Sequence, residues 1–162
     1  MTPEDINRLL YGRYGDLGWW PAETPYEVMA GAILTQNTAW GNVEKAIARF
    51  EGNLTPERVE AMPPDELADT IRPAGFFNQK AGYLKTLTAW FKRYGYSAEN
   101  ASGRGLEPLR EELLALRGIG KETADSILLY ALELPTFVVD AYTSRLLTRL
   151  GCGPCPPLSY DA

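Results

Sequence analysis

The sequence has only two cysteines, Cys152 and Cys155, which stand in the run Cys-Gly-Pro-Cys near the end of the chain. These two could pair with each other, form half of a metal site or have no function. A site of four thiolates would need a second pair of cysteines, and the chain has none. We therefore predict no metal site and no cofactor in this chain, and we interpret both cysteines as loop residues.

Long apolar runs are also missing, and this absence bears on where the protein works. The start Met1-Thr2-Pro3-Glu4-Asp5 is acidic where a secretory leader would be basic. Because neither a membrane span nor a leader is expected, we predict a cytoplasmic protein that does not bind membranes. The 162 residues, 45% of them hydrophobic, are enough for one folded core.

Basic residues are not in excess, since the formal net charge is −5. This balance argues against a protein that coats nucleic acids nonspecifically, because such proteins gain affinity by neutralising phosphates. One segment departs from this overall acidic balance. Between Thr70 and Ala98 all charged residues are basic, namely Arg72, Lys80, Lys85, Lys92 and Arg93. A solvated helix face and a track for phosphates explain this segment equally well.

Alternation typical of strands is absent as well, whereas helix signals recur along the chain. Thr-Pro with an acidic residue close behind marks helix starts at Thr2, Thr24 and Thr55. The stretch 95–105, rich in small and polar residues, is predicted to be a surface loop. Further helices are predicted over residues 41–50, 65–71, 79–94, 108–116, 121–132 and 142–150. The predicted fold class is therefore all-α.

Two glycines around one apolar residue, Gly118-Ile119-Gly120, separate two of these helices. Such a turn can present backbone N–H groups at the start of the second helix, where they form a seat for a phosphate. Arg117 and Lys121 flank the turn and would add positive charge, while Ile119 would point into the core. Taken alone, the same pattern is typical of an ordinary turn between helices.

The length of chain between the turn and Asp140 indicates where Asp140 would lie. A helix over residues 121–132 would be about 18 Å long, and an extended return containing Val138-Val139 would span roughly 20 Å. Asp140 would then lie level with the turn, where its carboxylate could face the same DNA strand. The alternative is that Asp140 only caps the helix that runs through Arg145.

These segments resemble a known family. Leu116-Arg117-Gly118-Ile119-Gly120-Lys121-Glu122-Thr123-Ala124 with Val138-Val139-Asp140 is similar to the helix-hairpin-helix (HhH-GPD) DNA glycosylases related to endonuclease III. The segments 32–38, which contains Gln36, and 75–81 resemble two DNA-facing loops of that family. The resemblance implies a helical bundle or barrel with a helix-hairpin-helix motif, whose second helical domain is incomplete because the chain ends early. It divides the chain into an N-terminal aromatic segment (1–23), a glycosylase core (24–150) and a truncated tail (151–162).

The resemblance implies a reaction as well. In members that also cut the strand, a lysine follows the hairpin at the position of Glu122. A carboxylate cannot form the Schiff base that this lyase chemistry needs, and Lys121 points about 100° away around the helix. We therefore predict a monofunctional glycosylase in which Asp140 stabilises the cationic sugar and orients or deprotonates a water molecule.

A substrate is suggested by the run Trp19-Trp20-Pro21 and by Trp40, which resemble 3-methyladenine DNA glycosylase III. That resemblance implies a pocket that stacks an alkylated purine between aromatic rings, which favours a base carrying positive charge. The alternative is that these tryptophans pack in the core or between helices.

An enzyme of this kind must extrude its target base and hold the gap open. By resemblance to the family loops, Gln36 and Phe76 are candidates to fill the gap and wedge the opposite strand, although both could be helix-terminal or core residues. Lys80 and Arg145 are candidate phosphate contacts. With the hairpin residues Gly118, Ile119, Gly120 and Lys121, they complete the predicted DNA-binding set.

The sequence thus predicts a base-excision-repair enzyme that acts as a monomer on double-stranded DNA containing damaged bases, and that associates with the nucleoid during repair. Two alternatives stay open: an endonuclease III-like glycosylase and lyase acting on oxidised pyrimidines, and a noncatalytic DNA-binding module that uses the hairpin as a clamp. Relatives of endonuclease III often carry an iron–sulfur cluster held by four cysteines. We expect one here only if a longer native chain supplies the cysteines.

Overall fold

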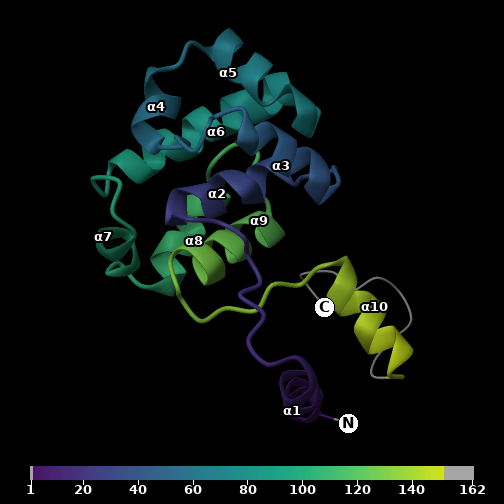
Figure 1. The fold of residues 1–162 in the computed structure, drawn as a ribbon. Coiled ribbons are helices and arrows are strands. Elements are labelled where there is room, and N and C mark those ends of the chain that lie inside the picture. The colour runs from purple at the N-terminus through teal and green to yellow at the C-terminus, as the bar shows by residue number, and fades with distance from the viewer. Residues whose placement is uncertain (1, 152–162) are drawn as a thin grey trace. The chain divides into compact units, whose positions relative to one another are not determined.

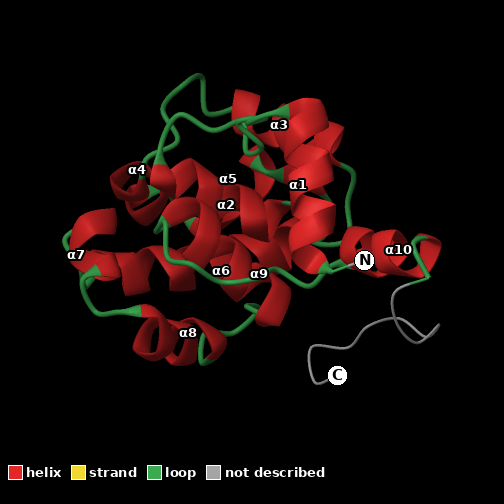
Figure 2. Ribbon diagram, turned by 90° about the horizontal axis from the view of Figure 1, so that it is seen from below, coloured by secondary structure: helices red, strands yellow, loops and turns green. Residues whose placement is uncertain are grey.

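The computed structural model describes residues 2–151, and in this part of the chain it is helical without any strand (Figure 2). Contacts divide the chain into two units. The larger unit is Ala22–Val138, and the smaller one combines Met1–Pro21 with Val139–Ala162. The predicted core, 24–150, therefore includes a helix, residues 141–149, that belongs to the smaller unit. None of the helices described is long and apolar enough to cross a membrane.

The larger unit holds most of the helices (Figure 1). In chain order they are α2 (Pro25–Leu34), α3 (Trp40–Ala48), α4 (Pro56–Ala61), α5 (Pro64–Thr70), the 3-10 turn η1 (Arg72–Ala74), α6 (Phe77–Lys92), α7 (Ala98–Ser102), α8 (Leu106–Leu114), α9 (Lys121–Ser126) and the π-helical turn η2 (Ile127–Ala131). The smaller unit holds α1 (Pro3–Tyr14) and α10 (Ala141–Arg149). The predicted all-α fold is confirmed.

The three Thr-Pro signals are helix starts, as predicted. Thr2, Thr24 and Thr55 are the N-cap residues of α1, α2 and α4, and each side-chain oxygen accepts a hydrogen bond from the backbone N–H three residues on, at 3.1–3.2 Å. A proline follows each cap, where the missing N–H has no helical partner to lose. The predicted helices from 41, 65, 79, 108 and 142 begin one or two residues earlier than expected.

The core of the larger unit is built around α2 and α6. Every residue of α2 from Val28 to Leu34 is buried, so this helix is covered on all sides and needs no polar face. Helix α6 packs against α2, α4 and α5. Its buried positions Leu84, Leu87 and Phe91 recur at three to four residues, the spacing of one helical face. Helix α2 ends within the first predicted DNA-facing segment, 32–38, and helix α6 begins within the second, 75–81.

The stretch 95–105 is a correction, because it contains a short helix where a loop was predicted. Ser97 caps α7 by accepting a hydrogen bond from the N–H of Asn100 at 3.2 Å, and Ala101 is fully buried. A helix of five residues with a single small apolar anchor has no visible periodicity. The cap Ser97 was the one local signal of a helix in this stretch.

Candidate active site and DNA-facing loops

The predicted hairpin is present between α8 and α9. Gly118 has φ +87°, and Gly120 is the N-cap of α9, where its carbonyl accepts a hydrogen bond from Ala124 N at 2.8 Å. Ile119 between them is 6% exposed, so it plugs into the core as predicted. The turn can therefore present its backbone N–H groups while its apolar side chain anchors it.

Close packing makes glycine necessary at position 118. A Cβ atom there would lie 2.3–2.4 Å from ring atoms of Tyr83 on α6, well inside contact distance. The positive φ independently disfavours any side chain. The sequence pattern indicated the turn, but it gave no sign that Tyr83 forms the floor beneath it.

A buried ion pair joins the two helices of the hairpin. Arg110 of α8 donates to both carboxylate oxygens of Asp125 of α9, from Nε at 2.8 Å and from Nη2 at 3.2 Å. The Asp125 side chain is 3% exposed and the Arg110 side chain 30% exposed, so this two-point contact satisfies a buried carboxylate and holds the two helices together. Sequence reasoning missed both residues, although an aspartate inside the buried run from Thr123 to Leu128 was a signal of a charged partner.

Gln36 connects a second segment to the hairpin. Its side chain is half-buried, and Nε2 donates to the carbonyl oxygen of Gly118 at 2.9 Å and to Oγ1 of Thr123 at 3.0 Å. The turn after α2 is thereby fastened to the hairpin and to α9. The structure thus brings Gln36 and the hairpin together, with the amide of Gln36 bound to protein groups.

Phe76 stands exposed at the start of α6. It is 64% exposed and adopts φ 45° and ψ 32°, the left-handed region that bulky residues rarely occupy. Strained backbone of this kind costs of order 1 kcal/mol and collects at functional sites. An exposed aromatic side chain held in a strained turn suits the predicted wedge and rules out the core alternative for Phe76.

Lys80 is a correction. It was predicted to contact a phosphate, but it is 2% exposed, and its ammonium donates to the carbonyl oxygens of Leu34 and Ala74, both at 2.8 Å. Burial lowers the pKa of its ammonium group. A buried cation whose donors are bound by the backbone does not reach the surface of the protein, so the phosphate role does not fit this position.

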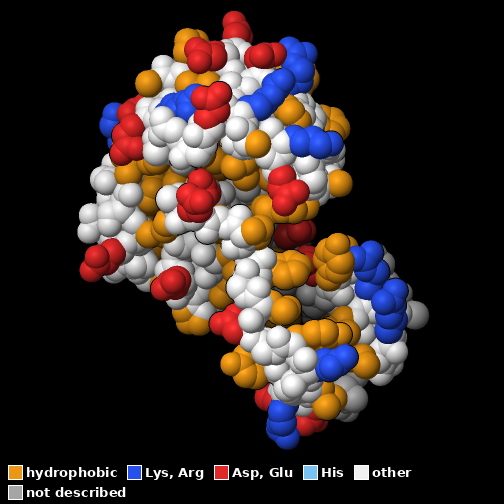
Figure 3. Space-filling model, in the orientation of Figure 1, with side chains coloured by type: hydrophobic (Ala, Val, Ile, Leu, Met, Phe, Trp, Pro, Cys, Tyr) orange, Lys and Arg blue, Asp and Glu red, His pale blue; other side chains and the backbone are white. Residues whose placement is uncertain are grey.

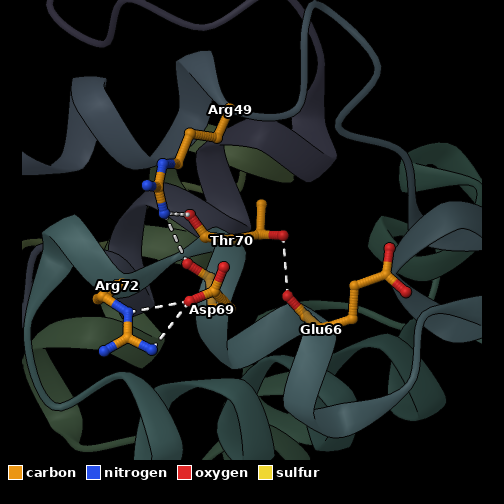
Figure 4. A network of polar contacts seen from close by, with 5 residues as sticks. All are labelled: Arg49, Glu66, Asp69, Thr70 and Arg72. Atoms are coloured by element: carbon orange, nitrogen blue, oxygen red, sulfur yellow. Dashed lines mark hydrogen bonds and ion pairs between the residues drawn. The ribbon is translucent and has the colours of Figure 1, made fainter.

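The other cations of the basic segment also have partners inside the protein. Lys85 donates to backbone carbonyls at the end of α4, Lys92 binds Glu60 at 2.6 Å, and Arg93 lies 3.5 Å from Glu112. Arg72 binds the carboxylate of Asp69, next to the backbone carbonyls that Arg49 caps (Figure 4). On the face of the larger unit in Figure 3, acidic and basic side chains are interspersed. Each basic side chain between Thr70 and Ala98 is thus bound by other groups of the protein.

Asp140 caps α10, which confirms the capping alternative and leaves the catalytic one a prediction. Its Oδ1 accepts hydrogen bonds from the backbone N–H of Thr143 at 2.7 Å and from Thr143 Oγ1 at 2.9 Å. The two hydrogen bonds orient the carboxylate on the first turn of α10. Leading up to it, the chain reverses after η2, where Leu134 N donates to Leu128 O at 2.9 Å. Asp140 and the hairpin belong to different units, so their approach to each other stays a prediction.

The remaining predicted residues lie in both units. Arg145 is exposed on α10, with its guanidinium 4.4 Å from the ring centroid of Tyr142. Lys121 and Glu122 form the first turn of α9, where Glu122 is exposed. In Figure 3 basic side chains lie over α10 of the smaller unit.

The predicted aromatic pocket also draws on both units. Trp19 is 65% exposed, Trp20 is half-buried and Pro21 is exposed, and all three belong to the smaller unit. Trp40 is half-buried at the first position of α3 in the larger unit. The pocket therefore stays a prediction, although the exposure of Trp19 does not suit a residue of the core.

Among the described residues no group of histidine, cysteine or acidic side chains could hold a metal ion. Cys152 and Cys155 lie outside the described residues. Two cysteines do not fit a cluster that needs four thiolate ligands.

Known proteins are similar to this chain over most of its length. The model of the HhH-GPD superfamily of base excision DNA repair proteins matches residues 30–154, which include the hairpin, Gln36 and Asp140. The chain belongs to the HhH-GPD superfamily. It is 51% identical over 150 residues to a protein of Methanocaldococcus jannaschii provisionally named a DNA repair glycosylase, a match that covers 90% of this chain and 68% of the relative.

Solved structures of the superfamily are similar to this chain. The 3-methyladenine DNA glycosylase of H. pylori bound to 1,N6-ethenoadenine is 33% identical with a TM-score of 0.75, covering 91% of this chain and 71% of that one. A noncovalent complex of endonuclease III with DNA is 26% identical with a TM-score of 0.70, covering 93% and 70%. The chain spans little more than half the length of the curated endonuclease III relatives it matches.

Proposed function

We propose that this HhH-GPD protein is a monofunctional DNA glycosylase that removes an alkylated purine such as 3-methyladenine from double-stranded DNA. The observation that carries the proposal is the hairpin at Gly118–Gly120, fixed on Tyr83 and Gln36 and followed by Glu122 at the lysine position. In this proposal the hairpin holds a phosphate, and the protein acts as a monomer in the cytoplasm.

The proposed chemistry is hydrolysis of the glycosidic bond. As the bond between C1′ of deoxyribose and the base nitrogen breaks, positive charge develops on the sugar, and the carboxylate of Asp140 stabilises it. The cationic purine keeps the electron pair of the broken bond and leaves as a neutral base. A water molecule oriented by Asp140 adds its oxygen to C1′, and its proton passes to the carboxylate of Asp140 or to solvent. The two hydrogen bonds from Thr143 support this role, because they hold the carboxylate in one orientation.

Absence of strand cleavage is the second part of the proposal. Glu122 has no amine that could attack C1′, so no covalent enzyme–sugar adduct is expected. Lys121 is its neighbour in the first turn of α9 and is the residue that an endonuclease III-like mechanism would have to use. The similarity to endonuclease III keeps that mechanism as the second candidate.

Two arguments support the proposed substrate: the positive charge of an alkylated purine, and the similarity of this chain to a solved glycosylase structure. Alkylation makes a purine cationic, and a flat cation gains by stacking on indole rings such as those of Trp19, Trp20 and Trp40. The similar structure from H. pylori is described as a 3-methyladenine DNA glycosylase and holds a modified adenine. Neither observation identifies the damaged base, so the experiment also compares the release of different bases.

The test is release of free base from methylated duplex DNA by the wild type and by Asp140→Asn. Asparagine retains the oxygen that caps α10, so the variant should fold, while base release falls by about a hundredfold or more because a charge at the transition state is lost. Asp65→Asn, which makes the same change on the exposed surface of α5, is the control and should keep wild-type activity.

Other results would revise the proposal in defined ways. Efficient trapping of a covalent adduct by borohydride, or faster release of thymine glycol than of 3-methyladenine, would favour the endonuclease III-like candidate. Tight binding to lesion-containing duplex without any base release, unchanged in Asp140→Asn, would identify a DNA-binding module.

A further inference from the structure

Two polar side chains of the larger unit join the three segments predicted to face DNA. These segments are the turn after α2 (35–38), the wedge turn Gly75–Phe76 and the hairpin 118–120. We propose that Lys80 is a positioning residue that couples the wedge turn to the end of α2 and, through the Gln36 segment, to the hairpin, so that strand opening and backbone binding occur in one fixed geometry. This inference rests on the proposed function, because it assigns the wedge to a glycosylase.

Lys80 holds the wedge turn from both sides. Its ammonium donates to the carbonyl oxygen of Ala74 at 2.8 Å, before the turn. Its backbone N–H donates to the carbonyl oxygen of Phe76 at 3.0 Å, the first helical bond of α6, which does not depend on the lysine side chain. The two acceptors enclose Gly75 and the strained residue Phe76. A left-handed, exposed phenylalanine is retained only if its surroundings fix it, and these bonds are such a restraint.

The same ammonium reaches the segment that carries Gln36. It donates at 2.8 Å to the carbonyl oxygen of Leu34, the last residue of α2. Two residues later, the amide of Gln36 binds Gly118 and Thr123. Hydrogen bonds of Lys80 and of Gln36, joined by the backbone from Leu34 to Gln36, therefore connect the wedge turn to the hairpin.

The chemistry of Lys80 suits a fixed connector. The carbonyls it binds lie at the ends of α2 and η1, where the partial negative charge of a helix end favours a cation. Both hydrogen bonds involve a charged donor in a buried site, which makes them strong and costly to lose. Gln36 remains a candidate to fill the gap, and in the protein without DNA its amide is bound to the hairpin.

Helix α6 contains a matched control for this proposal. Lys85 likewise directs its ammonium onto backbone carbonyls, those of Val59, Glu60 and Met62 at the end of α4. No predicted DNA contact belongs to that segment. Lys80→Met and Lys85→Met remove the same charge, keep an unbranched chain of similar length and break bonds to helix-end carbonyls, but only the first breaks the connection to the wedge turn.

The first measurement compares base release from methylated duplex with release from the single strand of the same sequence, in single turnovers at a temperature where all variants are folded. We expect Lys80→Met to slow release from duplex by about a hundredfold, because a small displacement of a positioned group costs that much. Release from the single strand, which needs no wedge, should change by less than about threefold. Lys85→Met should leave both rates close to those of the wild type.

The second measurement follows strand opening without chemistry. A duplex with a tetrahydrofuran abasic analogue and 2-aminopurine opposite should brighten when the wild type or Lys85→Met binds, and stay dim when Lys80→Met binds at saturation. If Lys80 acts through Phe76, adding Lys80→Met to Phe76→Ala should slow release from duplex no further. Lys80→Gln, which keeps one donor, replaces the methionine variant if that variant does not fold.

The outcomes separate this proposal from the proposed function. Equal losses on duplex and single strand, equal effects of Lys80→Met and Lys85→Met, or additive effects with Phe76→Ala would each overturn the positioning role. If the wild type releases no base, the proposed function fails, yet the 2-aminopurine experiment still tests the positioning role. A wild type that binds the abasic duplex without brightening it overturns that role as well.

Discussion

The hairpin at Gly118 and the helix start at Asp140 are the two features on which the proposed function depends, and they are fixed in different ways. Gly118 rests on Tyr83 and accepts a hydrogen bond from Gln36, residues far away in the sequence. Asp140 is oriented by Thr143, only three residues on. The hairpin therefore depends on how the whole larger unit packs, whereas the orientation of Asp140 on α10 depends on a local cap.

The difference teaches where each feature is vulnerable. A local cap can be lost without disturbing a core, because its partners lie on one turn of one helix. A turn pressed against an aromatic ring has no room to adapt, since cores are packed close to crystal density. Changes at the hairpin should therefore reach the stability of the larger unit, and changes at Asp140 should stay close to α10.

The largest expected effect comes from Gly118→Ala. The added Cβ would overlap the ring of Tyr83 and would sit at φ +87°, so we expect the free energy of unfolding to fall by about 3 kcal/mol. Urea denaturation measures it. Gly120→Ala is the control, because nothing lies within 4 Å of its Cβ and its φ is −90°, and it should cost about 1 kcal/mol or less. Equal costs would show that the hairpin is not held by packing on Tyr83.

A smaller effect is expected from Asp140→Ala. Loss of the cap should cost about 1 kcal/mol, measured as faster hydrogen exchange of the α10 amides, whereas Asp140→Asn should leave their exchange almost unchanged. Exchange in the larger unit should be the same in both variants. Slower exchange at α10 in Asp140→Ala, or changes that reach α2 and α6, would contradict a purely local role in folding.

The smallest effect is a pH dependence at Glu112, which ties the first helix of the hairpin to α6. Its carboxylate accepts hydrogen bonds from Trp90 Nε1 at 2.8 Å and Tyr94 OH at 2.7 Å. Burial raises the pKa of Glu112, but these hydrogen bonds and the positive charges of Arg93 and Arg104 together outweigh burial, and the net pKa lies below its ordinary value of 4.5.

A carboxyl whose pKa is lowered by folding contributes stability above its ordinary pKa, and this contribution is lost as the pH falls through the lowered value. As the pH falls below the ordinary value of 4.5, the wild type should therefore lose stability more steeply than Glu112→Gln. Denaturant titrations at each pH, followed by tryptophan fluorescence, measure the difference. Parallel curves would show that Glu112 does not help to hold the hairpin helix in place.

Local features of the fold followed from the sequence, because their causes lie within a few residues. The caps at Thr2, Thr24 and Thr55 and the turn of Gly118-Ile119-Gly120 are where the sequence predicts them. The short helix α7 was missed, since five residues with one buried alanine leave no periodic signal.

Predictions about charged side chains were the weakest part. Lys80 looked like a phosphate contact because its neighbours in sequence include no acid that could pair with it. The carbonyls that bind it belong to Leu34, forty-six residues away, and to Ala74. Likewise, Lys92 and Arg93 find Glu60 and Glu112 outside the basic segment. A count of charges along the chain cannot include partners that only folding brings near.

The sequence by itself determined the all-α fold, the caps at Thr2, Thr24 and Thr55, the hairpin turn and the family, because each depends on residues that are neighbours or that recur at helical spacing. Only the tertiary structure decided which side chains hold the hairpin and whether a lysine faces solvent or backbone. The contacts of Tyr83 with Gly118, of Gln36 with the Gly118 carbonyl and of Arg110 with Asp125 were not predicted from the sequence. The physical reason is that close packing and burial of charge arise between segments distant in sequence, and no local pattern encodes which of them will meet.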